Sequence, residues 1–184
     1  FKGREYADWQ PDQIEDEKFL SQFLDIRAVR KLPGSIVSKL YTSTSPYARY
    51  AYGIWLWATC KDSISFKTTF KIFEESAREG IADALQMLSR MYYLGEAYDE
   101  KAEKFVMDRK LSQELEVQAI EKGSIRAKLR RNYDLFYGTS DVEPDRAAAI
   151  AEAEREASVF SESILWTEQL GCFYEFEGER EKAM

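Results

Sequence analysis

The chain has 184 residues, of which 45% are apolar and 32% charged, a composition that excludes a wholly disordered protein and suits one domain with a buried core. Its net charge of −7 is concentrated near one end, since residues 141–184 carry 12 acidic and 4 basic side chains, so we expect no nucleic-acid partner there. The longest apolar run, near residues 50–60, is too short to cross a bilayer, so we expect no membrane insertion.

The first 45 residues are predicted to form an N-terminal helical cap. Apolar side chains recur at three- and four-residue steps from Ile14 onward, which predicts a helix that ends before Pro33. A second, shorter helix is expected over residues 35–41. The Ser/Thr-rich stretch 42–46 then separates the cap from the rest of the chain.

From residue 46 to residue 184 the sequence repeats itself with a displacement of 43 residues. The equivalent residues are glycines that can end a helix in the left-handed conformation and alanines that give the next helix a small contact surface. The pairs are Gly80 and Gly123, Ala84 and Ala127, and Gly95 and Gly138. A period of this length with two helical stretches per unit predicts an all-α superhelix, or solenoid, of stacked antiparallel helix pairs.

Seven helices are expected in this region, joined by short connections because the chain has only 9 Gly and 4 Pro. Asp145, which follows Pro144, starts an alanine-rich helix. Residues 96–106 are interpreted as an insertion, part loop and part extra helical turn. The helices are expected at about 46–60, 65–79, 82–94, 108–122, 124–137, 145–159 and 162–176.

Three stretches share a pattern of alanine, leucine, tyrosine and glycine. The clearest runs from Ala84 through Leu88-Ser89-Arg90-Met91-Tyr92 to Gly95, and Leu170-Gly171-Cys172-Phe173-Tyr174 with Gly178 matches it again. Residues 48–56 are a weaker copy. This pattern resembles the Sel-like repeat family, which is related to the tetratricopeptide repeats.

The resemblance implies a superhelix whose concave surface is lined by the first helix of each pair. Its members are typically adaptors or scaffolds that bind other proteins, and bacterial examples include immunity proteins. One copy departs from the pattern, because Arg131 and Asn132 stand where leucine and glycine are expected. The apolar stripe of Ile125, Leu129 and Tyr133 suggests that this helix is rotated.

The helical register predicts which side chains face a partner protein or peptide segment in the concave groove. An aromatic first half, a central arginine and an acidic far end would suit a segment that carries a basic residue. The alternative is that the aromatic residues are core residues packed against the cap. The predicted partner-binding residues are Tyr47, Tyr50, Ile54, Trp57, Asp83, Gln86, Arg90, Tyr93, Glu168 and Glu175.

The residue types that commonly carry catalysis are absent or badly placed. The chain has no histidine, no glycine-rich phosphate loop and no serine-nucleophile motif. The adjacent pair Glu74 and Glu75 and the series Glu152, Glu154 and Glu156 are interpreted as solvated helix faces. We therefore expect no enzyme activity, no catalytic residue, no cofactor and no metal.

Other functions and locations stay open at this point. One alternative is a bacterial immunity or regulatory protein that blocks a partner enzyme. Another is a self-assembling structural protein, a homo-oligomer in which the apolar face of the last helix meets another copy. The thiols of Cys60 and Cys172 are expected to be free and buried, with a long-range disulfide between them as the alternative in an exported protein. A start at Phe1 indicates a trimmed chain, and both the cytoplasm and the bacterial periplasm are compatible with the sequence.

Overall fold

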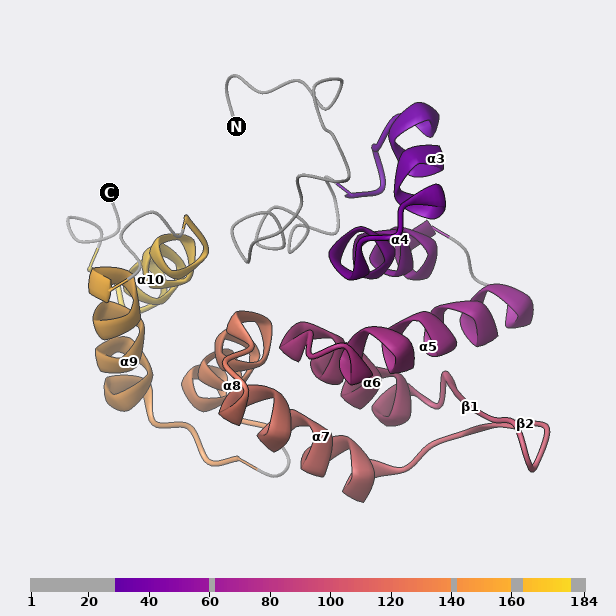
Figure 1. Ribbon diagram of the computed structural model, residues 1–184. Helices are drawn as coiled ribbons and strands as arrows, with labels where there is room; N and C mark the ends of the chain where they lie inside the picture. The colour runs from indigo at the N-terminus through magenta and orange to yellow at the C-terminus, as the bar shows by residue number, and fades with distance from the viewer. Residues whose placement is uncertain (1–28, 60–61, 140–141, 160–163, 180–184) are drawn as a thin grey trace. The chain divides into compact units, whose positions relative to one another are not determined.

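A computed structural model of the protein describes residues 29–59, 62–139, 142–159 and 164–179 (Figure 1). These residues form eight α-helices and one two-stranded β-hairpin. The mostly helical structure confirms the predicted all-α class. The elements are α3 (Gly34–Thr42), α4 (Pro46–Thr59), α5 (Ser63–Arg78), α6 (Ala82–Leu94), β1 (Ala97–Asp99), β2 (Lys104–Val106), α7 (Arg109–Glu121), α8 (Ile125–Tyr137), α9 (Arg146–Val159) and α10 (Ile164–Phe176).

The helices begin and end close to the residues that the sequence predicts, because local signals set their ends. Aspartate side chains cap the N-termini of α5 and α7, where Asp62 and Asp108 accept hydrogen bonds from backbone N–H groups of the first turn. Gly80 and Gly123, 43 residues apart, both have positive φ angles, of 94° and 88°. The glycine-terminated helix ends of the two copies therefore share one backbone geometry.

The chain divides into two compact units, residues Phe1–Ser124 and Ile125–Met184. In the N-terminal unit each helix from α3 to α7 packs on the next one along the chain, and α6 contacts both α5 and α7. One apolar core runs through these helices, built around fully buried side chains such as Ile54, Phe73 and Met87. The cap that the sequence predicts over residues 1–45 lies largely outside the described residues, and its described helix α3 packs on α4.

In the C-terminal unit α8, α9 and α10 pack against one another. Their core combines large aromatic side chains with small ones, because Phe136, Trp166 and Phe173 lie beside Ala149 and Ala153. The small contact surface of α9 follows from its alanine-rich sequence and lets the helix approach its neighbours closely.

The prediction of an extra helical turn within residues 96–106 is wrong, because this segment is an antiparallel hairpin. Tyr98 pairs with Phe105 across its two strands, and the two rings lie 5.3 Å apart. The Phe105 ring also meets Phe66 of α5, and the ammonium group of Lys67 lies 4.0 Å from the centre of the Tyr98 ring. Contacts with the helix surface therefore stabilise a hairpin that is too short to be stable alone.

Candidate interaction surface

Most of the predicted groove residues on α4 are buried. Tyr50, Ile54 and Trp57 are at most 5% exposed, because α4 has neighbours on two sides, α3 and α5. The ring of Tyr50 lies 5.7 Å from that of Phe73 in α5. Tyr47 is half-buried against the same core. The prediction that these side chains line an open groove is wrong, and the alternative that they are core residues fits the structure.

Two predicted groove residues contact each other. The guanidinium group of Arg90 lies 4.8 Å from the centre of the Trp57 ring. The indole N–H of Trp57 donates a hydrogen bond of 2.8 Å to the carboxylate of Glu96. These contacts join α4 to α6 and the residues that follow it, so they hold the N-terminal unit together.

The predicted exposure of Asp83 and Gln86 is also wrong. Both side chains are buried, because α6 is covered by α5 on one side and by α7 on the other. The Asp83 carboxylate accepts a hydrogen bond of 2.5 Å from the hydroxyl group of Ser124, just beyond the end of α7. Of the residues predicted on α6, Tyr93 is exposed, and the guanidinium group of Arg109 lies 5.7 Å from its ring.

Glu168 and Glu175 on α10 are exposed, as the register predicts. Cys172, one turn from each of them, is a free thiol that is exposed and not buried as expected. The other cysteine, Cys60, lies outside the described residues.

The C-terminal unit carries an exposed aromatic cluster that the sequence analysis did not identify as a site. Tyr133, Tyr137 and Phe176 are 49%, 38% and 53% exposed. The rings of Tyr133 and Tyr137 lie 4.4 Å apart, and that of Tyr137 lies 5.5 Å from Phe176. Together with Cys172, which is exposed one turn before Phe176 on α10, they are called the aromatic surface below.

A rigid base lies beneath the aromatic surface. The buried rings of Phe136 and Phe173 stack face to face with their centres 3.9 Å apart. Phe136 immediately precedes Tyr137 on α8, and Phe173 lies one turn before Phe176 on α10, so each helix carries one buried and one exposed aromatic ring. The exposed rings are therefore anchored at their bases by the core.

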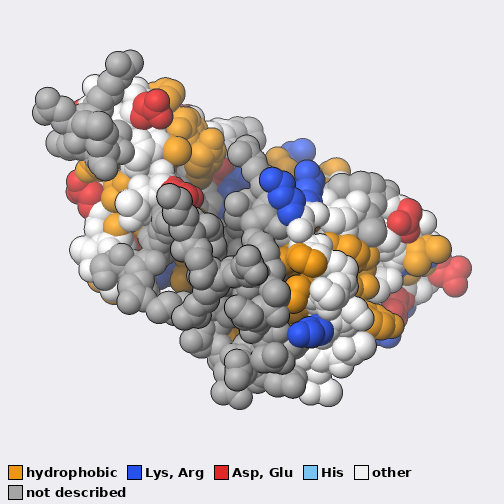
Figure 2. Space-filling view, turned by 90° about the horizontal axis from the view of Figure 1, so that it is seen from above, with side chains coloured by type: hydrophobic (Ala, Val, Ile, Leu, Met, Phe, Trp, Pro, Cys, Tyr) orange, Lys and Arg blue, Asp and Glu red, His pale blue; other side chains and the backbone are white. Residues whose placement is uncertain are grey.

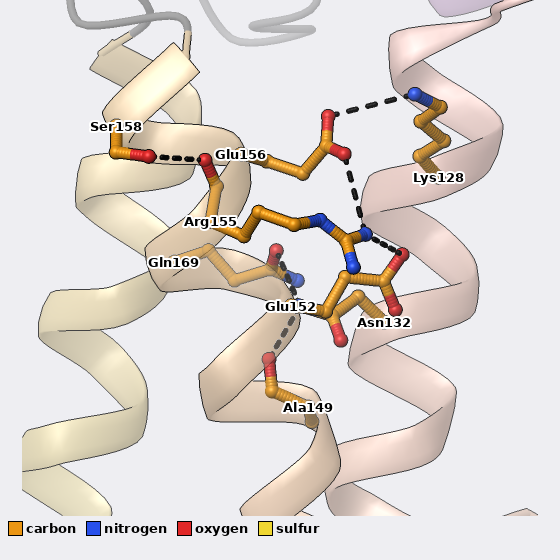
Figure 3. A network of polar contacts seen from close by, with 8 residues as sticks. All are labelled: Lys128, Asn132, Ala149, Glu152, Arg155, Glu156, Ser158 and Gln169. Carbon is orange, nitrogen blue, oxygen red and sulfur yellow. Dashed lines mark hydrogen bonds and ion pairs between the residues drawn. The ribbon is translucent and has the colours of Figure 1, made fainter.

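The predicted rotation of α8 is wrong, because the apolar stripe that suggested it would turn Tyr133 inward. Ala127, Asn132 and Phe136 are the buried residues of this helix, and Tyr133 is exposed. The amide nitrogen of Asn132 donates a hydrogen bond of 3.1 Å to the backbone carbonyl of Ala149 in α9, and it lies 3.5 Å from the amide oxygen of Gln169 in α10 (Figure 3). Gln169 in turn donates to the carbonyl of Leu129. In the sequence, the presence of Asn132 where the repeat pattern has glycine was the feature that indicated a polar contact at this position.

Polar contacts also fix α9 against its neighbours. Glu156, which the sequence analysis assigned to a solvated face, is buried and pairs with Lys128 of α8 at 3.5 Å and with Arg155 at 3.5 Å (Figure 3). Glu154 accepts a hydrogen bond from the hydroxyl group of Tyr174. This hydrogen bond, together with burial, raises the pKa of Tyr174 to about 12. Removal of one partner would leave a buried polar group unsatisfied.

The charges around the aromatic surface are mixed. The guanidinium group of Arg146, the first residue of α9, lies 4.7 Å from the centre of the Phe176 ring and 3.3 Å from the Glu177 carboxylate. Burial and the neighbouring Tyr133 raise the pKa of Tyr137, so the hydroxyl group of Tyr137 stays neutral at physiological pH. Figure 2 shows the same mixture on a wider scale, with apolar side chains at the surface beside acidic and basic ones.

Comparisons with known proteins add no relative, because no family model, curated protein or solved structure matches the chain. The resemblance to the Sel-like repeats therefore stays a prediction. Within the described ranges, no helix has the length and apolar character needed to cross a membrane.

Proposed function

We propose that this protein is a protein-interaction module, an adaptor or scaffold, that binds a partner through the aromatic surface of its C-terminal unit. The observation that carries the proposal is the exposure of three neighbouring aromatic rings, Tyr133, Tyr137 and Phe176, on a packed base. Contiguous exposed apolar groups mark interaction sites more often than isolated ones do.

The chemistry of this surface suits protein binding. Tyrosine and arginine are the residue types that most often dominate binding energy, and Arg146 borders the rings. Because Phe136 and Phe173 hold the surface rings from below, few side-chain rotamers are lost when a partner binds. This position replaces the concave groove as the proposed contact site, since the groove residues of α4 are core residues.

A stacked-repeat architecture is part of the same proposal. Its support is the matched geometry of the two glycine-ended helices: Ile81 N–H donates to the Ser76 carbonyl, and Ser124 N–H donates to the Ala119 carbonyl, 43 residues further on. Repeat arrays of helix pairs present rigid surfaces for other proteins.

Site-specific photo-crosslinking in cells of the source organism tests the proposed function. A photoreactive amino acid is placed at Tyr133, and the matched control places it at Val159, which is exposed at the far end of α9 from Arg146. We expect one discrete adduct with a different protein from position 133 and none from position 159. An adduct of twice the chain mass would support self-assembly in place of an adaptor. Equal labelling at both positions would contradict the proposed surface.

A further inference from the structure

The arginine that already lies on the aromatic surface indicates the chemical class of the partner. Arg146 is held between an aromatic ring and a carboxylate: its guanidinium group lies 4.7 Å from the centre of the Phe176 ring and 5.7 Å from that of Phe136, and its Nη1 atom lies 3.3 Å from Glu177 Oε1. A cation over a ring face with an anion beside it is a favourable arrangement for a guanidinium group.

The rest of the surface offers the same two kinds of group to a second guanidinium. Tyr133 and Tyr137 expose their rings, and Glu168 and Glu175 expose carboxylates on the neighbouring α10. Within the part of the chain that the structure describes, neither carboxylate forms an ion pair. On α8 the nearby Arg130 is neutralised by Asp134 at 3.0 Å. The carboxylates of Glu168 and Glu175 therefore offer ion-pair partners to a second cation.

We propose that the aromatic surface binds an arginine-bearing segment of the partner protein and that Arg146 acts as its internal competitor on Phe176 and Glu177. This inference rests on the proposed function and specifies its partner. This competition differs from general charge attraction, because Arg146 occupies one ring face, that of Phe176, and one carboxylate, that of Glu177. Its removal frees a ring face and a carboxylate, whereas removal of another arginine changes only the net charge.

The test measures how a fluorescently labelled arginine-containing model peptide binds the full chain, by fluorescence anisotropy at low and high salt. Sequence-matched peptides with glutamine or glutamate in place of arginine are the peptide controls. Arg146→Gln is compared with Arg155→Gln, which removes the same charge from the same helix. Among the described residues, Arg155 pairs with Glu152 and Glu156 and lies over no aromatic ring. Arg146→Lys is a milder variant that keeps the charge and loses the planar group.

We expect the arginine peptide to bind about three- to tenfold more tightly than the glutamine peptide, and Phe176→Ala to reduce that difference. At low salt both glutamine variants bind the arginine peptide more tightly, because each makes the negative net charge of the chain larger. At high salt the gain persists for Arg146→Gln, and in part for Arg146→Lys, but disappears for Arg155→Gln, because screening removes only the long-range term.

Three outcomes would overturn the inference. Equal binding of the arginine and glutamine peptides, both lost in Phe176→Ala, would leave the aromatic surface as a binding site and reject the basic partner. Equal gains for the two arginine variants at high salt would reject internal competition. No binding of any peptide would reject the arginine-bearing segment, while crosslinking from position 133 would still decide the proposed function separately.

Discussion

Two phenylalanines on α10 provide a sharp test of which side chains form the core and which form the surface. Phe173 and Phe176 lie one turn apart, and the same truncation to alanine can be made at each. Phe173 is fully buried and stacks on Phe136, and removal of such a ring costs about 3–5 kcal/mol of unfolding free energy.

The cost at Phe176 is smaller by an amount that its exposure determines. Because the residue is 53% exposed, about half of its transfer free energy is lost, roughly 1 kcal/mol. The contact with Arg146 adds about 0.5–1 kcal/mol at an exposed site. We therefore expect Phe176→Ala to cost about 1–2 kcal/mol, clearly less than Phe173→Ala.

Urea denaturation of the full chain, followed by far-UV circular dichroism, measures both values on one scale. Phe176→Leu serves as a control that keeps apolar volume and loses the ring. A loss at Phe176 as large as that at Phe173 would place Phe176 in the core, and the aromatic surface would then not exist as described.

Three further predictions follow from other contacts. Gly53→Ala lowers the melting temperature, because the added Cβ atom would lie 2.8 Å from Ile72 and overpacking costs about 1–3 kcal/mol. As the control, Gly34→Ala leaves the melting temperature unchanged or raises it, because the Cβ atom added there meets nothing within 4 Å. Ser124→Ala costs about 1–3 kcal/mol in urea denaturation, because the buried Asp83 carboxylate loses its hydroxyl donor, and no loss would contradict that hydrogen bond. The raised pKa of Tyr174, about 12, stabilises the folded protein at pH values below about 10, where the tyrosine of the unfolded chain is also neutral. This stabilisation is lost as the pH rises toward 12. Tyr174→Phe should therefore flatten the decline of the unfolding free energy over that pH range.

The helical elements could be predicted from the sequence because their determinants are local. Capping aspartates such as Asp108 and terminal glycines such as Gly123 act within one turn, so the helix boundaries agree with the structure. The hairpin was missed because three-residue strands carry little periodicity and Tyr98 and Phe105 are stabilised by contacts with α5.

The binding surface could not be predicted by the same reasoning, because exposure depends on which neighbours cover a helix. The register argument assumes one buried face and one open face, and it fails for Trp57 and Asp83 because α4 and α6 have neighbours on more than one side. It succeeds for Glu168 and Glu175, whose helix α10 has an open side. On α8 the argument also fails, because Asn132, which stands where the repeat pattern has glycine, is buried, and Tyr133 of the predicted apolar stripe is exposed.

The free thiol of Cys172 permits the most direct test of the central claim that a partner covers the aromatic surface. In a Cys60→Ser variant, the rate of Cys172 alkylation is measured in intact cells and in the purified protein. The reference is a second variant with Cys60→Ser, Cys172→Ser and Val159→Cys, whose single thiol replaces an exposed side chain outside the aromatic surface. We predict slower alkylation of Cys172 in cells than in the purified protein, relative to the reference thiol. Equal relative rates in the two settings would mean that the surface is unoccupied and would contradict its assignment as a binding site.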